Sequence, residues 1–263
     1  MTRHLVALDI DGTTITHEGE LRESVRRAVQ DVAAAGHHVT IATGRAVMGT
    51  LPILDRLGIT TGYAVCSNGA LTLRLDPELD LGYEIIESVT FDPAPVLTLL
   101  REHAPTALVA VEEPGVGFKV SANFPDGELD ASERVVPWEE LLLHPVTRVT
   151  LRQPEASPDE FLELVERAGL HGVNYAVGWS AWLDINPEGV SKASGLEPLR
   201  RLLGVEPMHT LAVGDQRNDL EMLRWAARGV AMANAPDEVK AAADEVAGHV
   251  DDDGLVAVLR SLL

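Results

Sequence analysis

The chain is poor in cysteine, lysine, aromatic residues and long apolar runs. Cys66 is the one cysteine among 263 residues, which excludes a disulfide within the chain and is typical of a reducing compartment. It follows the apolar stretch Tyr63–Val65, so we interpret it as a small core residue rather than a reactive thiol. A hydrophobic content of 46% still allows a substantial core, in one large domain or two smaller ones.

Basic residues are also scarce. Lys and Arg number 21 against 41 Asp and Glu, which gives a formal net charge of -20. Nucleic-acid binders usually carry a basic surface, and anionic membranes repel an acidic protein, so we expect neither partner. A small phosphorylated metabolite stays compatible with this charge, because one metal ion, one lysine or one helix N-terminus makes a local positive site.

No apolar run approaches the roughly 20 residues that a membrane-spanning helix needs. The first apolar stretch is interrupted early by Asp9 and Asp11, which does not resemble a signal peptide. We therefore expect a cytoplasmic protein.

Strand and helix patterns alternate at both ends of the chain. Short apolar runs predict buried strands, and helical spacing of apolar residues predicts helices between them. The predicted strands are Leu5–Leu8, Val39–Ala42, Tyr63–Cys66, His209–Val213 and Gly229–Met232. Such alternation predicts a parallel sheet with right-handed crossovers.

The middle of the chain has a different pattern. Strand signals there include alternating polar and apolar stretches, and two helix signals are interleaved, at Pro93–His103 and Pro158–Ala168. This pattern favours a separate α+β domain with a partly solvated sheet. We therefore predict an α/β core built from residues 1–80 and 188–263, with an α+β domain of residues 81–187 inserted into it.

Polar residues follow three of the predicted core strands. Asp9 and Asp11 follow the first strand, Thr43 the second, and Asp215 a later one. Ligands bind outside the carboxyl ends of strands in open parallel sheets. Carboxylates gathered there repel one another at low dielectric, and a divalent cation relieves that repulsion. Oxygen ligands with few carboxylates suit Mg²⁺.

Each of these residues also has a plainer interpretation. Asp219 alone is typical of a helix cap, Thr43 alone of a turn, and Lys192 alone of a solvated surface charge. Capping does not require several carboxylates to converge at one sheet edge, so the set as a whole favours a metal-assisted site.

These residues resemble the motifs of the haloacid dehalogenase superfamily. "DIDGTT" is similar to its DxDGT signature, Thr43 in "IATGR" to its second motif, Lys192 to its third, and "GDQRND" to its fourth. "CSNGA", "DINPEGVSKASGL" and "VAMANAPDEVKAAAD" further resemble the Cof-type phosphatases. The resemblance implies an α/β fold with a Rossmann-like parallel sheet core and an inserted α+β cap domain.

The resemblance also implies a role for each motif residue. Asp9 is the nucleophile that forms an aspartyl-phosphate, and Asp11 is the general acid and then the base. Thr43, the Gly44 amide and Lys192 bind the phosphoryl oxygens. Mg²⁺ is expected to bind the Asp9 carboxylate, the Asp11 carbonyl and the Asp215 carboxylate. Asp219 is expected to bind the metal through water or to orient Lys192. Asn218 is expected to contact the substrate or to lie behind a residue that does, and Arg45 to point towards the cap.

The leading hypothesis is a Mg²⁺-dependent phosphatase for small phosphate monoesters, such as sugar phosphates or related metabolites. Two alternatives stay open: a phosphomutase of the same superfamily, and a non-catalytic metabolite-binding module. The protein could be a monomer or a homodimer. Candidate specificity residues in the inserted domain are Lys119, Asn123, Arg148, Trp179 and Trp182.

Overall fold

The computed structural model describes residues 2–153, 173–177 and 182–263. The helix predicted at Pro158–Ala168 and the candidate residue Trp179 lie outside these residues. Within them, no helix combines the length and the apolar character needed to cross a membrane.

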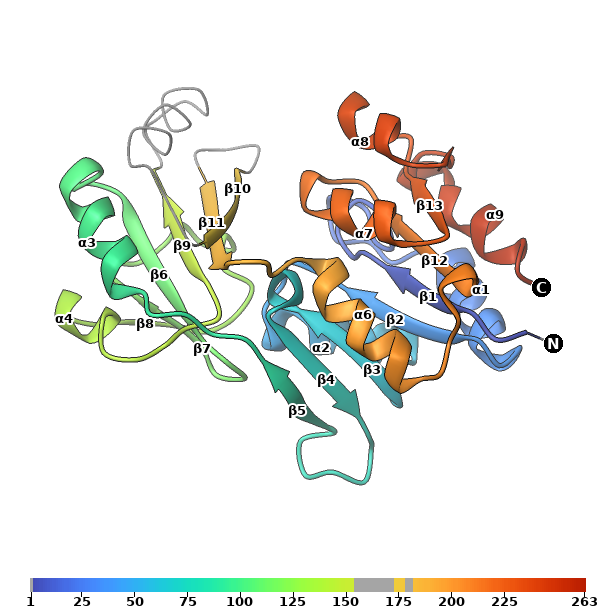
Figure 1. Ribbon diagram of the computed structural model, residues 1–263, viewed down its shortest axis with the longest axis horizontal. Helices are drawn as coiled ribbons and strands as arrows, with labels where there is room; N and C mark the ends of the chain where they lie inside the picture. Colours follow the sequence, from blue (N-terminus) through green and yellow to red (C-terminus); the bar gives the residue numbers. More distant parts are fainter. Residues whose placement is uncertain (1, 154–172, 178–181) are drawn as a thin grey trace. The chain divides into compact units, whose positions relative to one another are not determined.

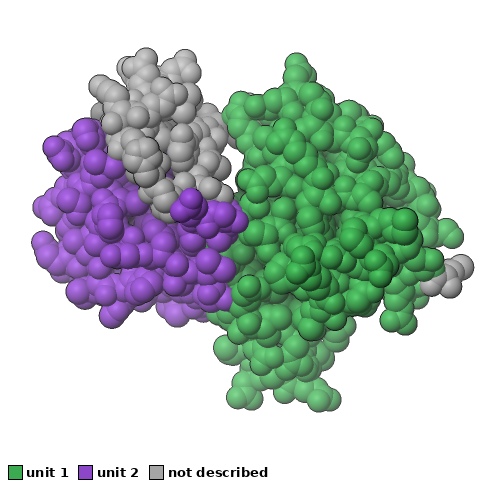
Figure 2. All heavy atoms as spheres, in the orientation of Figure 1, with its two compact units in different colours: residues 1–44, 50–87, 191–263 green, residues 45–49, 88–190 purple. Residues whose placement is uncertain are grey.

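The chain divides into two compact units (Figure 2). Unit 1 comprises residues 1–44, 50–87 and 191–263, and unit 2 comprises residues 45–49 and 88–190. The N-terminal and C-terminal parts of the sequence therefore build one unit together, and most of the middle forms the other.

Unit 1 is built on a sheet whose described strands follow the order β14-β13-β12-β1-β2-β3-β4-β5 (Figure 1). The strands are β1 (Leu5–Leu8), β2 (His38–Ala42), β3 (Gly62–Cys66), β4 (Leu71–Leu75), β5 (Tyr83–Ser88), β12 (Thr210–Gly214), β13 (Arg228–Ala231) and β14 (Glu245–Val246). All pairs from β14 to β3 are parallel, and β4 is antiparallel to β3. Every residue of β1 is buried, as expected for a central strand covered on both faces. The α/β fold with a parallel sheet core is thus confirmed.

Several helices of unit 1 pack on its sheet or on one another. They are α1 (Glu23–Ala34), α2 (Val47–Leu57, whose first three residues belong to unit 2), α6 (Lys192–Leu202), α7 (Leu220–Trp225), α8 (Asp237–Ala242) and α9 (Gly254–Arg260). Leucines of α6, Met222 of α7 and Val239 of α8 pack on one face of the sheet, against small strand residues such as Ala7 and Ala212. Helix α1 packs against α9.

The first boundary between the two units lies later in the sequence than the predicted boundary between residues 80 and 81. Strand β5 is the edge strand of the core sheet, next to β4, and unit 1 runs to Glu87. An alternating strand at a sheet edge has the same pattern whichever sheet it joins, which explains the difference. At the other end, unit 1 resumes at Ser191, three residues after the predicted position 188.

Unit 2 contains a mostly antiparallel sheet with the described order β10-β11-β9-β6-β7-β8. Its strands are β6 (Leu108–Glu113), β7 (Gly117–Val120), β8 (Glu133–Val135), β9 (Val149–Arg152), β10 (Val173–Val177) and β11 (Trp182–Pro187). Helices α3 (Ala94–His103) and α4 (Trp138–Leu141) contribute Leu97, Leu100 and Leu141 to an apolar cluster with Val149 and Ile185.

Histidines gather where three central strands of unit 1 begin. His4 precedes β1, His38 starts β2, and His209 precedes β12. The ring of His4 lies 5.1 Å from that of His37 and 5.2 Å from that of His209. Burial, with the neighbouring His37 and His209, lowers the pKa of His4. Burial, Arg3 and His37 lower the pKa of His38.

These lowered pKa values predict that the two histidines stabilise the fold less in mild acid. Below the unfolded histidine pKa of about 6.5, each of these histidines binds more protons in the unfolded chain than in the folded chain, so its contribution to the free energy of unfolding falls as pH drops. This contribution is complete above that value and is lost as pH falls through the lower folded pKa. Because other groups titrate in the same range, the His4 contribution is measured as a difference: we expect the Tm of the wild type minus that of His4→Gln to fall by about 2 °C between pH 7.5 and 5.5. Thermal unfolding of both proteins in EDTA measures this, and equal slopes would contradict it.

Candidate active site

The candidate site lies at the edge of the core sheet where β12, β1 and β2 end. These strands are neighbours and parallel, with Leu8 of β1 opposite Val213 of β12 and Ile41 of β2. The next residues are Asp9, Thr43 and Asp215, and all three are buried. Three segments that are far apart in the sequence thus bring together the polar residues that directly follow their strands.

A tight turn holds Asp9 at the end of β1. The backbone N–H of Asp9 continues the sheet by donating to the Val213 carbonyl at 3.0 Å, and the Thr14 hydroxyl donates to the Asp9 carbonyl at 2.6 Å. Gly12 has φ of +75°, and a Cβ there would lie 2.3 Å from Oδ2 of Asp215. Only glycine meets both the positive φ and the close approach.

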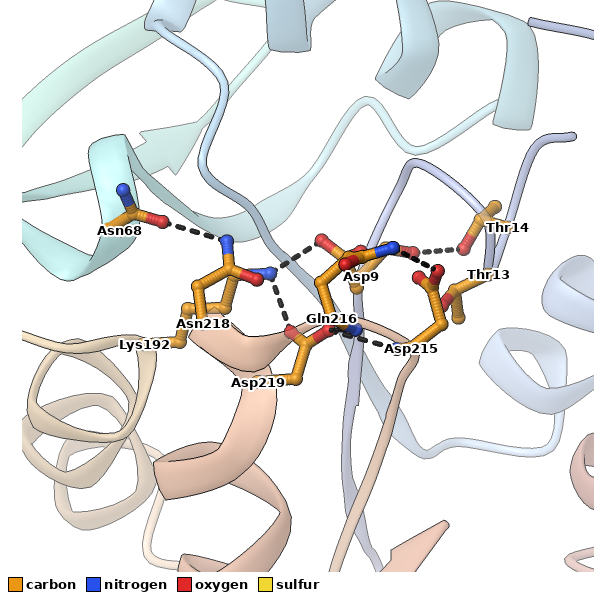
Figure 3. A network of polar contacts seen from close by, with 9 residues as sticks. All are labelled: Asp9, Thr13, Thr14, Asn68, Lys192, Asp215, Gln216, Asn218 and Asp219. Carbon is orange, nitrogen blue, oxygen red and sulfur yellow. Dashed lines mark hydrogen bonds and ion pairs between the residues drawn. The ribbon is translucent and has the colours of Figure 1, made fainter. Parts of the chain in front are cut away.

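Lys192 is fully buried at the first position of α6. Ser191 caps this helix, with its side chain accepting from the Ser194 N–H and the Ser194 side chain accepting in return, so the start of α6 is well defined. The Lys192 Nζ donates to Oδ1 of Asp9 and to Oδ1 of Asp219, each at 2.6 Å (Figure 3). The ammonium therefore bridges the first and fourth motifs.

A short turn after β12 positions Asp215 and Asp219. Oδ2 of Asp219 accepts from the backbone N–H of Asp215 at 2.9 Å and of Gln216 at 2.8 Å. Both oxygens of Asp219 are thus engaged, one by Lys192 and one by this turn. Asp215 accepts from the Thr13 hydroxyl at 2.9 Å and from the Gln216 side-chain amide at 3.0 Å (Figure 3).

The three carboxylates of the site, Asp9, Asp215 and Asp219, outnumber the one lysine that neutralises them. Burial first, and then the charge of Asp219, raise the pKa of Asp9 well above its usual value despite Lys192. The same two causes raise the pKa of Asp215 to about 6. Burial opposes the charge of Lys192, yet Asp219 and Asp9 raise its pKa above the usual value. The site has an excess of buried negative charge.

This donor set fits a hard divalent cation. One oxygen from each of Asp9, Asp215 and Asp219 lies within 4.8 Å of the others, and Mg²⁺ prefers carboxylate and carbonyl oxygens. A cation among them would relieve the repulsion that raises the two carboxyl pKa values.

Comparison with known proteins identifies the family. The family model of the haloacid dehalogenase-like hydrolases matches residues 6–259. The chain belongs to this family. It is a phosphatase-type enzyme of the superfamily's Cof-type branch.

Several relatives of this haloacid dehalogenase-like (HAD) enzyme match over nearly their full length. Pyridoxal phosphate phosphatase YbhA of Escherichia coli is 29% identical over 289 residues, covering 100% of both chains. The 5-amino-6-(5-phospho-D-ribitylamino)uracil phosphatase YitU of Bacillus subtilis is 29% identical, covering 98% of this chain and 96% of YitU. A solved HAD-superfamily phosphatase from Bacteroides thetaiotaomicron is 27% identical, with a TM-score of 0.80, covering 99% of this chain and 95% of that one.

Asn68, to which the sequence motifs assigned no role, also lies at this site. The Asn218 side-chain amide donates to Oδ1 of Asn68 at 3.0 Å (Figure 3), and a Cβ on Gly44 would lie 2.9 Å from the same oxygen. The Asn68 N–H also donates to the Thr43 carbonyl at 3.0 Å. Asn68 thus links the second and fourth motifs. The "CSNGA" stretch marked the position, and the positive φ of Asn68, 56°, is a conformation that asparagine tolerates.

Two cationic candidates of the inserted domain have carboxylate partners within unit 2. Lys119 Nζ lies 2.9 Å from Glu113 Oε1. Arg148 is buried and donates from Nε to Glu112 at 3.2 Å. Their role in substrate selection stays a prediction.

Three further candidates for substrate contact lie in unit 2. Asn123 is exposed, and Trp182 lies edge-on to Phe124, with ring centroids 6.0 Å apart. Arg45 belongs to unit 2 with its neighbour Ala46 and donates to the Gly49 carbonyl at 3.4 Å. Their functional roles also stay predictions.

Proposed function

We propose that the protein is a Mg²⁺-dependent phosphatase that hydrolyses small phosphate monoesters through an aspartyl-phosphate on Asp9. The observation that carries this proposal is the arrangement around Asp9: a buried carboxylate, hydrogen-bonded by one lysine and surrounded by further carboxylates. Such a group is oriented for attack and needs a cation beside it before a phosphate dianion can approach.

The chemistry follows from the residues present. A carboxylate oxygen of Asp9 attacks phosphorus while the bond from phosphorus to the ester oxygen breaks, and Asp11 gives a proton to the leaving oxygen. Asp11 then takes a proton from water, which attacks the aspartyl-phosphate and releases inorganic phosphate. Lys192 neutralises phosphoryl charge, and Thr43 with the Gly44 amide positions the phosphoryl oxygens.

The Asp9 carboxylate, the Asp11 carbonyl and the Asp215 carboxylate would hold the metal. Mg²⁺ supplies positive charge that lets the anionic substrate approach the carboxylates. For Asp219 we favour the role of orienting Lys192, because both its oxygens already accept hydrogen bonds from Lys192 and the Asp215–Gln216 turn.

The substrate class is a small phosphorylated metabolite. Relatives that match over nearly the full chain are named as phosphatases of pyridoxal phosphate and of a ribitylaminouracil phosphate, and both substrates carry a phosphate monoester. Arg45 and Asn218 are proposed to contact the substrate, and the cap residues would choose among leaving groups.

Metal removal tests this proposal. We expect purified protein to release phosphate from p-nitrophenyl phosphate and from a panel of metabolite monoesters with Mg²⁺, and to lose at least about 99% of that rate in EDTA. Readdition of Mg²⁺ should restore the rate, while Ca²⁺ should support it poorly because of its larger, looser coordination shell. Full turnover without metal would overturn the metal requirement. Binding without phosphate release would favour the metabolite-binding module, and isomerised phosphate esters would favour the phosphomutase.

A further inference from the structure

Asn234 lies in the loop after β13, at the same edge of the core sheet as the carboxylates. Strand β13 pairs with β12, so the two strands end together. Backbone bonds fix the loop, because the Met232 N–H donates to the Gly214 carbonyl at 3.0 Å and the Ala233 N–H to the Gly248 carbonyl at 3.2 Å. The side chain of Asn234 therefore projects from a well-supported backbone.

This side chain joins three segments of unit 1. Its Nδ2 donates to the Gly12 carbonyl at 2.8 Å and to Oδ2 of Asp215 at 3.2 Å. Its Oδ1 accepts from the Val250 N–H at 3.1 Å. The orientation of the amide is fixed by these neighbours, because a backbone N–H can only donate and a carbonyl can only accept.

The two acceptors of Nδ2 belong to different parts of the candidate metal site. Gly12 follows Asp11 in the tight turn after β1, and Asp215 follows β12. A Cβ on Gly12 would lie 2.3 Å from Oδ2 of Asp215, so the turn and this carboxylate are already in close approach. A neutral amide can hold a carbonyl oxygen and a carboxylate oxygen together there without adding another charge to a site that has an excess of carboxylates.

We propose that Asn234 is a positioning residue of the metal site, which holds the Asp215 carboxylate and the Asp11–Gly12 turn in the relative placement that a divalent cation requires. The proposal rests on the metal site of the proposed function. Residues that orient metal ligands typically change metal affinity or activity by about 10- to 100-fold when they are removed.

The test is direct metal binding in the absence of substrate. Mn²⁺ has the charge and the oxygen preference of Mg²⁺, and electron paramagnetic resonance counts its free ions. We expect Asn234→Ala to weaken Mn²⁺ binding about tenfold, and to raise the Mg²⁺ concentration for half-maximal turnover by a similar factor. The kcat at saturating Mg²⁺ should fall much less, because excess metal restores the ligand arrangement.

Thr210→Val is the matched control. The Thr210 hydroxyl is buried, donates to the Pro207 carbonyl at 2.7 Å and accepts from the Ala227 N–H at 2.7 Å, but it lies at the opposite end of β12 from Asp215. This variant should lower Tm and leave Mn²⁺ binding unchanged. Asn234→Ser, whose side chain is too short to reach all three partners, replaces Asn234→Ala if the latter does not fold.

The outcomes separate the two proposals. If the wild-type protein does not bind Mn²⁺, the metal site of the proposed function is wrong. If the wild type binds and the Asn234 variant binds equally well, the inference about Asn234 is overturned. Equal weakening in the Thr210 control would overturn it too, because a general loss of stability would then explain the effect.

Discussion

Replacement of Asp9 by asparagine should lower phosphate release at least about a thousandfold while the protein stays folded. An amide is a poor nucleophile and cannot form the acyl-phosphate. The fold should tolerate the change, because burial and the neighbouring carboxylates disfavour the charged form of Asp9 and raise its pKa. We expect Tm in EDTA to be unchanged or higher, since one of the mutually repelling carboxylates is removed.

Two measurements decide this prediction. Steady-state phosphate release with saturating Mg²⁺ gives the rate, and acid-quenched single turnovers with labelled substrate detect phosphorylated protein. The wild type should show the covalent species and Asp9→Asn should not. A variant that keeps more than about a hundredth of the wild-type rate with metal bound would contradict nucleophilic attack by Asp9.

The α/β core could be predicted from sequence because its signals are local. Leu5–Leu8 is a continuous apolar run, and it forms a strand with every residue buried. Helix α9 (Gly254–Arg260) was not predicted, because seven residues carry too little periodicity to stand out. Strand β5 was assigned to the inserted domain because strand pattern alone does not reveal which sheet an edge strand joins.

Part of the site could be predicted because polar and charged residues directly follow the buried strands. Asp9 and Asp215 each follow a buried strand, and the structure places them with Lys192 and Asp219 in one hydrogen-bonded network. Thr13, Gln216 and Asn234 were not singled out. Each is an ordinary turn residue by sequence, and only the folded chain shows that its donor faces the Asp215 carboxylate.

Two candidates in the inserted domain also show what the sequence alone could not reveal. Lys119 and Arg148 are conspicuous as cations in an acidic chain, which made them candidates for substrate contacts. In the structure they have acidic neighbours of their own, Glu113 and Glu112. A cation with a local carboxylate partner has less charge to offer a ligand, so substitution is needed to decide whether either residue selects substrates.

Replacement of Lys192 by alanine should lower kcat/KM by roughly a hundredfold or more, which corresponds to about 3 kcal/mol of lost transition-state stabilisation. Lys192 is fully buried, and its ammonium lies 2.6 Å from both Asp9 and Asp219. Its loss removes the one side-chain cation that the structure shows at the Asp9 carboxylate. The phosphate dianion would then meet an even more negative site, with Mg²⁺ as the main compensating charge.

The substitution also affects the fold, and the experiment has to separate the two effects. Removing one partner from a buried ion pair typically costs about 3–5 kcal/mol of stability, so kinetics must be measured below the Tm of each variant.

Lys192→Met fills the space without the charge and should be as impaired as Lys192→Ala. Lys192→Arg should be more active than Lys192→Ala but less active than the wild type, because a planar guanidinium does not replace a compact ammonium between two carboxylates. Lys240→Ala, on α8, is the control and should be near neutral. If Lys192→Ala or Lys192→Met kept wild-type kinetics on the best substrate, Lys192 would have no part in phosphoryl transfer, and the buried contact with Asp9 would be structural alone.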